Sequence, residues 1–321
     1  MKIFLSCPAP PRSRKGNRIT ALRWARILKS LGHQASIGQA LDRVDYDLLV
    51  ALHARRSHVV AKEFRRLYPH RPLVVALTGT DLYRDIHTSR KAQQTLEMAD
   101  RLIVLQVCGR EELPASVRTK TRVLYQSAQK TPVRKRSARR FFDVCVLGHL
   151  RHEKDPFRAA LALQHLPASS NIRVTHAGEA LSPALARQAR QLMAHEPRYH
   201  WIGEVPRWRA RRILARSSLL VLSSLMEGGA NVLSEALVDG VPVLASRIAG
   251  SVGILGADYP GFFEVGDTQA LAGLLTRAEM DVSFYNSLRR WCKRLAPQFR
   301  PARERLCWKR LLGELKADAA S

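Results

Sequence analysis

Two glutamates, Glu227 and Glu235, lie eight positions apart, with the glycine pair 228–229 between them. The apolar run 218–224 precedes them and predicts a buried strand. Glu227 therefore falls in a loop just past a strand end, where binding residues tend to concentrate. Asn231 is a good helix N-cap, and the residues after it predict a short helix. Glu235 would lie one turn into that helix.

This strand, turn and helix pattern has the properties of a phosphate site. Glycines let a ligand approach the main chain closely. The amides of Ala230, Asn231 and Val232 would point outward with the helix dipole behind them, which suits a phosphate or diphosphate. The carboxylates of Glu235 and Glu227 would accept hydrogen bonds from ribose and sugar hydroxyls. The pattern favours a nucleotide-sugar site, and a plain turn with surface glutamates is the alternative.

The chain is strongly basic, with 53 Lys and Arg against 27 Asp and Glu and a formal net charge of +26. Such an excess can indicate nucleic acid, anionic membrane or a polyanionic substrate as partner. The basic residues concentrate at 134–140 and 207–212, but neither stretch is interleaved with aromatic platforms or set in a helix-turn-helix frame. We therefore expect no nucleic-acid partner, and a basic nucleic-acid-binding protein is the remote alternative.

Other bulk properties narrow the class of protein. No apolar stretch approaches the length of a membrane span, and the first residues lack the apolar region of a signal peptide. The five cysteines are odd in number, widely spread and form no CxxC pair, which argues against a disulfide framework and a zinc site. We expect a cytoplasmic protein without integral membrane association.

Short apolar runs alternate with helical patterns along the chain, which is typical of parallel sheets covered by helices on both faces. A polar stretch at 129–142 predicts a linker between two doubly wound domains. Ligands of such sheets bind outside the carboxyl ends of the strands. The predicted strands are 2–7, 47–52, 72–78, 101–106 and 122–127 before the linker, and 143–150, 172–178, 198–205, 218–224 and 242–246 after it.

The predicted domains are residues 1–138 on the acceptor side, residues 139–295 on the donor side, and a C-terminal helical segment, 296–321. That segment places Trp308, Leu311, Leu312 and Leu315 on one helical face. This apolar face could pack back on either domain, and packing on the N-terminal domain is one expectation.

Two motifs resemble a known enzyme family. The segment EGGANVLSEALVDGVPVLAS (227–246) resembles the E-x7-E signature of GT-B glycosyltransferases of the family 4 type, including its G-x-P-V-x-A-S tail. LGHLRHEKDP (147–156) is similar to the G-R-L-x-x-E-K stretch of that family. The resemblance covers nearly the whole chain. It implies an α/β GT-B fold, with two doubly wound Rossmann-like domains facing across a cleft, and a UDP-sugar as co-substrate.

The resemblance also implies roles for individual residues. Glu235 would hold the ribose, and Glu227 would contact the donor sugar. Lys154 matches the lysine that grips the donor diphosphate. His149 stands where the family has an arginine, and Arg151, two residues on, could replace that arginine. The implied catalytic residues are thus Lys154, Arg151 and Glu227.

The loops HAGE (176–179) and WIGEV (201–205) resemble those that line the sugar and uracil pockets in the family. The resemblance implies a metal-free site, so we expect neither a metal nor another cofactor. The histidines His149, His152 and His176 are expected to be structural rather than catalytic. The implied donor-binding residues are Gly148, His149, Lys154, Gly178, Gly203, Glu204, Val205, Glu227, Gly228, Gly229, Ala230, Asn231, Val232 and Glu235.

Further phrases resemble a more specialised group, the selenosugar synthases of selenoneine biosynthesis. These phrases include PAPPRSRKGNRITALRWARIL (8–28), LVALHARRS (49–57) and ALTGTDLYRDI (76–86). Such enzymes accept selenophosphate and form a carbon–selenium bond at the anomeric carbon of a sugar from a UDP-sugar such as UDP-N-acetylglucosamine. The resemblance implies this reaction, with neighbours in a selenoneine pathway. An ordinary family 4 transferase with a glycan or lipid acceptor is the alternative.

Selenophosphate is a small, multiply charged anion, so its pocket needs cations and amide donors. The segment 12–18 follows the first predicted strand and offers both, although a solvated basic turn is the alternative. The segments 53–57 and 78–84 follow two further strands, where Arg55 and Arg56 would add positive charge. The expected acceptor-binding residues are Lys15, Gly16, Asn17, Arg18, Thr78, Thr80, Asp81 and Arg84.

Overall fold

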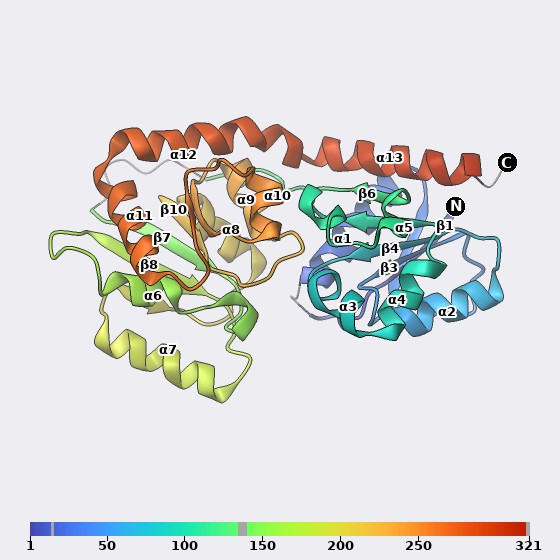
Figure 1. Cartoon of the computed structure of the whole chain (residues 1–321), viewed down its shortest axis with the longest axis horizontal. Helices are drawn as coiled ribbons and strands as arrows, with labels where there is room; N and C mark the ends of the chain where they lie inside the picture. Colours follow the sequence, from blue (N-terminus) through green and yellow to red (C-terminus); the bar gives the residue numbers. More distant parts are fainter. Residues whose placement is uncertain (14–15, 134–139, 319–321) are drawn as a thin grey trace. The chain divides into compact units, whose positions relative to one another are not determined.

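The computed structural model describes residues 1–13, 16–133 and 140–318, and the chain divides into two compact units. Unit 1 comprises Met1–Ser127, Glu227–Asn231 and Pro301–Ser321, and unit 2 comprises Ala128–Met226 and Val232–Arg300. Each unit contains one six-stranded parallel sheet with helices on its faces (Figure 1). The expected α/β class with two Rossmann-like domains is confirmed. Within the described residues, no helix combines the length and the apolar character that crossing a membrane requires.

The sheet of unit 1 has the strand order β2-β1-β3-β4-β5-β6. Its order reverses between β1 and β3, and this switch point is where ligands bind in open α/β sheets. The strands are β1 (Lys2–Ser6), β2 (Gln34–Gly38), β3 (Leu48–Leu52), β4 (Leu73–Leu77), β5 (Arg101–Val104) and β6 (Thr121–Val123). The helices are α1 (Gly16–Ser30), α2 (His58–Leu67), α3 (Ile86–Thr88), α4 (Arg90–Met98), α5 (Ala115–Arg118) and α13 (Pro301–Asp318), with shorter turns η1 (Asp81–Asp85) and η2 (Val107–Arg110).

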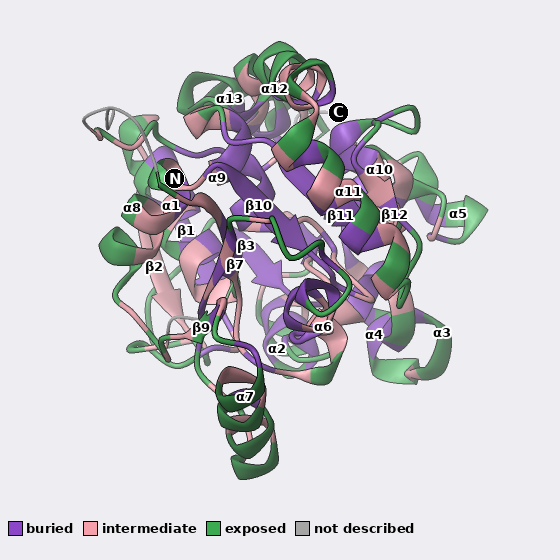
Figure 2. Ribbon diagram, turned by 90° about the vertical axis from the view of Figure 1, so that its left-hand side faces the viewer, coloured by how far each residue is buried: buried purple, intermediate pink, exposed green. Residues whose placement is uncertain are grey.

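Alternate residues of the central strands supply two apolar cores, one on each face of this sheet. In β3, Leu48 and Val50 pack with α1 and α13, whereas Leu49 and Ala51 pack with α2 and α4. Figure 2 shows the central strands as buried. A strand covered on both faces is apolar at every position, which is why these strands were predicted from continuous apolar runs.

Two short strands were not predicted, and both lie at a sheet edge. β2 is paired only with β1, and its residues are partly exposed. β12 (Phe262–Phe263) has two residues and is paired only with β11. β2 has few apolar residues and β12 has only two residues, so neither shows the apolar run that marks a central strand.

The sheet of unit 2 has the order β12-β11-β10-β7-β8-β9, so its switch point lies between β7 and β10. Helix α7 is mostly exposed and stands out in Figure 2. The other strands are β7 (Phe142–Leu147), β8 (Ile172–Ala177), β9 (Tyr199–Trp201), β10 (Leu219–Leu222) and β11 (Val243–Ser246). The helices are α6 (Arg158–Leu163), α7 (Pro183–His195), α8 (Arg207–Arg216), α9 (Asn231–Asp239), α10 (Ala249–Leu255), α11 (Thr268–Met280) and α12 (Val282–Leu295), with turns η3 (His152–Lys154) and η4 (Ala296–Phe299).

Helix α13 closes one core of unit 1 and carries a buried carboxylate, Glu304, which is 1% exposed. Its oxygens accept hydrogen bonds from Trp24 Nε1 at 2.7 Å, from Arg23 Nε at 3.0 and 3.1 Å, and from the Ser127 amide at 2.9 Å. The Ser127 hydroxyl donates to it as well. Trp308 packs edge-on against Trp24, with ring centroids 5.1 Å apart. The carboxylate therefore joins α1, the end of the first sheet and the last helix.

In unit 2, the buried ring of His176 holds the ends of β7, β8 and β9 together. Nδ1 lies 2.9 Å from the Tyr199 hydroxyl, and Nε2 lies 3.1 Å from the Gly148 carbonyl oxygen. Burial lowers the pKa of His176 to about 4, although the Gly148 carbonyl partly opposes the shift. A Cβ at Gly178 would stand 1.8 Å from that same carbonyl oxygen, so only glycine fits there.

Replacing Glu304 with leucine leaves Arg23 and the Trp24 and Ser127 donors without their buried acceptor. We expect the free energy of unfolding to fall by about 3–5 kcal/mol, measured from the midpoint of urea unfolding. Glu314→Leu is the matched control on the same helix, because Glu314 pairs with Arg101 and Arg122 near the surface and such pairs contribute about 1 kcal/mol or less. Equal shifts in the two variants would contradict the role given to Glu304.

His176 makes stability fall as the pH is lowered. Its folded pKa lies below the ordinary value of 6.5, so between pH 6.5 and about 4 the unfolded chain binds a proton that the folded chain does not. This difference amounts to about 3 kcal/mol lost over that window. We expect His176→Phe to reduce the loss of melting temperature across these pH values, with His195→Phe on exposed α7 as control. A pH dependence unchanged in His176→Phe would refute this assignment.

Candidate functional site

The switch point of unit 2 brings together the loops after β7 and β10. The Ser223 hydroxyl donates to the carbonyl oxygens of Lys154 at 3.2 Å and Asp155 at 2.8 Å. The Leu225 amide donates to the Glu153 carbonyl oxygen at 3.0 Å. These bonds fix the backbone around Lys154 at the carboxyl end of the sheet, where the sequence predicted a diphosphate-gripping lysine.

Several expected donor residues line one small cavity at this place. It has a volume of about 10 Å³, which is room for roughly one water molecule. The aliphatic part of Lys154 lies over Gly148, since a Cβ built on Gly148 would be 3.8 Å from Lys154 Cδ. The cavity is lined by Val146, Leu147, Gly148, His149, Lys154, Pro156, His176, Val221, Leu222, Ser223 and Ser224.

His149 is half-buried beside two carboxylates, Glu179 and Glu204, with possible ligand atoms of the three residues within 4.8 Å of one another. Burial lowers the pKa of His149, and the two glutamates oppose this shift. Nδ1 accepts a hydrogen bond from the Glu179 amide at 3.2 Å, so the neutral ring carries its proton on Nε2. The lone pair of Nδ1 is engaged in this bond, and the expectation that the site needs no metal stays a prediction.

The loops after β8 and β9 lie against each other. The Gly178 amide donates to the Gly203 carbonyl oxygen at 2.8 Å, and Trp201 Nε1 donates to the Gly178 carbonyl oxygen at 2.8 Å. Glu204 is exposed directly after Gly203, and Val205 is half-buried. The donor residues expected on these two loops are therefore neighbours in the structure.

Glu235 on α9 is held by two arginines of α8. Its Oε1 lies 2.9 Å from a guanidinium nitrogen of Arg207 and 3.4 Å from one of Arg211. The Arg207 side chain is 48% exposed, whereas that of Arg211 is 11% exposed. The carboxylate expected to accept bonds from ribose hydroxyls thus already has cationic partners. The sequence analysis missed both arginines as site residues, because no local motif links them to Glu235.

Arg211 belongs to a larger network in unit 2. Its guanidinium also donates to Asp239 Oδ2 at 2.8 Å, to Thr131 Oγ1 at 2.8 Å and to the Gln129 carbonyl oxygen at 2.7 Å. The basic stretch 207–212 therefore has paired arginines inside unit 2. The other basic stretch, 134–140, lies almost wholly outside the described residues.

The remaining donor and catalytic predictions fall on two segments. Helix α9 begins at Asn231 and is followed by Gly240, whose φ of 73° only glycine adopts readily. Within the loop before it, Gly228 and Ala230 are buried, Glu227 and Gly229 are partly exposed, and Val232 is buried in the first turn. Arg151 is partly exposed just before η3. The roles of all these residues stay predictions.

In unit 1, the first turn of α1 contains an arginine with a buried donor that no described residue accepts. Nε of Arg18 is buried and makes no hydrogen bond to any residue that the structure describes. Arg18 lies beside the buried Cys7. Burial raises the pKa of the Cys7 thiol, and the charge of Arg18 partly opposes this shift. Gly16 and Asn17 form the start of α1, whereas Lys15 lies outside the described residues.

The loop after β4 is organised around Asp81, which is fully buried. Its Oδ1 accepts the amides of Thr78 at 3.0 Å and Gly79 at 2.8 Å, and its Oδ2 accepts the Ala54 amide at 3.0 Å. Asp81 therefore braces two loops, and its expected contact with the acceptor stays a prediction. The expected residues Thr78 and Thr80 are partly exposed on the same loop.

Two further residues lie near the carboxyl ends of β3 and β4. Arg84 is half-exposed, with Nε 3.4 Å from Asp85. His53, directly after β3, is 3% exposed with a φ of 78°. The sequence analysis named only its neighbours Arg55 and Arg56, because no residue pattern discloses a left-handed backbone.

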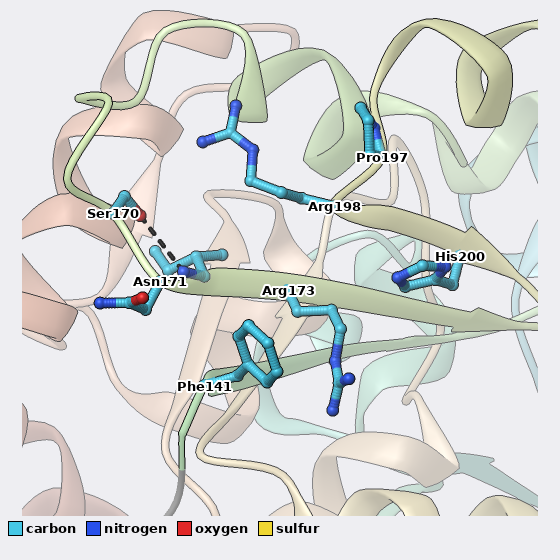
Figure 3. A pocket seen from close by; sticks show the side chains of 8 residues that line it. Phe141, Ser170, Asn171, Arg173, Pro197, Arg198 and His200 are labelled. Atoms are coloured by element: carbon cyan, nitrogen blue, oxygen red, sulfur yellow. Dashed lines mark hydrogen bonds between the residues drawn. The ribbon is translucent and has the colours of Figure 1, made fainter.

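A pocket of about 230 Å³ lies at the opposite end of the second sheet, where β7, β8 and β9 begin (Figure 3). Arg173 lies over the Phe141 ring, 4.6 Å from its centroid, and pairs with Asp143 at 2.7 Å. Arg198 pairs with Glu196 at 2.7 Å. Since its arginines are paired and it lies away from the carboxyl ends of the strands, we do not assign the substrate site to this pocket.

Comparison with known proteins gives one family match and many structural neighbours. The profile of the family described as glycosyl transferases group 1 matches residues 128–294. A glycosyltransferase 1 domain-containing protein 1 of Xenopus tropicalis is 26% identical over 284 residues, covering 79% of this chain and 81% of that protein.

Two solved structures illustrate the shared fold. Sucrose-phosphate synthase from Thermosynechococcus elongatus superimposes with a TM-score of 0.82 at 16% identity, covering 99% of both chains. Anabaena HepE in complex with UDP superimposes with a TM-score of 0.77 at 16% identity, covering 98% of this chain and 99% of that one. These likenesses confirm the GT-B type of fold. Because the family match spans more than half of the sequence, this chain belongs to the group 1 glycosyl transferases.

Proposed function

We propose that this group 1 glycosyltransferase takes N-acetylglucosamine from a UDP-sugar and transfers it to selenophosphate, as a selenosugar synthase of selenoneine biosynthesis. The donor part of the proposal is supported by neighbours of the same fold that were solved with UDP and with UDP-glucose. It is also supported by Lys154 and Gly148 at the switch point of unit 2 and by Glu235 on the adjacent helix α9.

The observation that carries the acceptor part is the buried Nε of Arg18. Among the described residues this N–H has no acceptor, which is unfavourable by about 1–3 kcal/mol and more for a charged group, so the site is suited to a ligand that supplies the acceptor. A phosphorus oxyanion provides such oxygens. The resemblance of the segments 8–28, 49–57 and 76–86 to selenosugar synthases makes selenophosphate the proposed anion.

In the proposed reaction, selenium attacks the anomeric carbon. The C–Se bond forms as the bond from that carbon to the UDP oxygen breaks, and the electron pair of the broken bond leaves with UDP. Lys154, Arg151 and the first amides of α9 would stabilise the charge on UDP. The selenium nucleophile is already anionic, so no strong general base is needed. Water then cleaves the P–Se bond to give phosphate and the selenosugar, a step to which we assign no residue.

The acceptor is tested by turnover with UDP-N-acetylglucosamine. We expect UDP release to depend on selenophosphate, because only the selenium anion supplies the nucleophile. Release is measured by a coupled assay for UDP, and the selenosugar by mass spectrometry. Inorganic phosphate serves as the control anion without selenium. UDP release at the same rate without selenophosphate, or with a glycan or lipid acceptor instead, would overturn the assignment in favour of an ordinary family 4 transferase.

The donor site is tested through Glu235. We expect Glu235→Ala to weaken UDP binding about tenfold or more, because hydrogen bonds from ribose hydroxyls to a charged carboxylate contribute about 1.5–3 kcal/mol. Titration calorimetry with UDP gives the dissociation constant. Glu264→Ala is the control, since Glu264 is exposed and pairs only with Arg247 among the described residues. Unchanged affinity for UDP in Glu235→Ala would remove Glu235 from the donor site.

A further inference from the structure

A residue with a left-handed backbone lies at the switch point of the sheet of unit 1. His53 has a φ of 78°, and in the described part of the chain only one other non-glycine residue, Asp155, has a positive φ. A side chain held in this region is strained, and such residues gather at functional sites. His53 directly follows β3, and the adjacent strand β1 leads through a loop to helix α1, whose first turn contains Arg18.

The ring of His53 is buried and bonded on both sides. Nδ1 accepts a hydrogen bond from the Arg56 amide at 3.4 Å, and Nε2 lies 3.2 Å from the Thr80 hydroxyl oxygen. The backbone is anchored as well, because the His53 amide donates to the Ala76 carbonyl oxygen at 2.8 Å. The strained residue therefore links the loops after β3 and β4.

The surrounding charges do not require a charged ring. Burial lowers the pKa of His53, and the nearby arginines 55 and 56 lower it further, against the raising effect of Asp81 and Asp85. The two carboxylates are already satisfied, Asp81 by three backbone amides and Asp85 by Arg55 Nε at 2.9 Å. The ring is thus neutral, and because Nδ1 accepts a bond, its proton is assigned to Nε2.

This proton position fixes the role of Thr80. A hydroxyl oxygen that accepts from Nε2–H turns its own hydrogen away from the ring. Thr80 is partly exposed, so that hydrogen can be donated to a ligand outside the buried cluster. A directed neutral donor suits an oxygen of an anionic substrate.

We propose that His53 is a positioning residue that acts through Thr80. Its strained backbone places the ring so that a hydrogen bond from Nε2 directs the Thr80 hydroxyl toward an oxygen of the anionic acceptor. This inference rests on the proposed function for the identity of the acceptor. It differs from that proposal in naming a buried residue with no substrate contact of its own. Glycine would adopt the same backbone without strain but would leave Thr80 undirected.

The variants that test this are His53→Asn, Thr80→Val and the double variant. Asparagine tolerates a left-handed backbone, so His53→Asn keeps the turn and removes the ring. We expect each single variant to raise the KM for selenophosphate about tenfold, the value of one hydrogen bond. The double variant should be no worse than Thr80→Val, since the ring acts only through that hydroxyl.

Three further measurements separate this role from a merely structural one. The dissociation constant of UDP should be unchanged in all three variants, because Gly148, Lys154 and Glu235, on which the donor proposal rests, lie in unit 2. Thr88→Val, an exposed threonine at the end of α3, is the matched control and should keep the wild-type KM. Additive effects of His53→Asn and Thr80→Val on KM, or a His53→Asn effect confined to the melting temperature, would overturn the inference.

The experiment also distinguishes failure of the inference from failure of the proposed acceptor. Binding of inorganic phosphate is measured by calorimetry with UDP present, as a probe that shares the oxygens of selenophosphate. If the wild type releases UDP independently of selenophosphate, while His53→Asn and Thr80→Val still weaken phosphate binding non-additively, the acceptor is wrong and the role of His53 holds. If selenophosphate is the acceptor but phosphate affinity and KM are unaffected in His53→Asn, the role of His53 is refuted.

Discussion

Both units depend on one constraint: a parallel sheet that is covered on both faces has no solvent-exposed face for polar side chains. Its central strands must be apolar at every position, and their backbone groups are satisfied by neighbouring strands. Polar side chains can gather only where strands end. The carboxyl ends of adjacent strands meet at one edge, so groups far apart in the chain, such as Lys154 and Ser223, become neighbours there.

The same constraint explains why the fold could be predicted from sequence. Runs such as 47–52 and 218–224 are apolar throughout because both faces of β3 and β10 are covered. The edge strands β2 and β12 lack such a run and were missed for that reason, whereas the edge strands β6 and β9 were predicted. The apolar face of the last helix was visible as well, but not its buried Glu304, because a carboxylate among Arg, Trp and Ser donors has no signature in local spacing.

The site was predictable only where the chain itself brings residues close. Gly148 and Lys154 lie on one post-strand loop, and Glu227 and Glu235 lie on one loop and helix, so motif spacing indicated them. Partners supplied by other elements were not foreseeable. Arg207 and Arg211 reach Glu235 from α8, and the left-handed turn at His53 depends on contacts with the loop after β4. Part of the positive charge of the chain thus pairs with carboxylates of the same chain. The net charge is therefore weaker evidence for nucleic-acid binding.

Helix α13 has a consequence for how the protein is made. The core of unit 1 that includes Trp24 and Leu28 also includes Trp308, Leu311 and Leu315. On the ribosome, the first strands emerge long before these residues, so this core stays open while the rest of the chain is synthesised. Unit 2, whose segments all precede residue 301, can close earlier. Unit 1, which contains the first residues of the chain, therefore completes its core later than unit 2 during translation. A premature stop codon that removes α13 would leave the core around Trp24 and Leu28 incomplete.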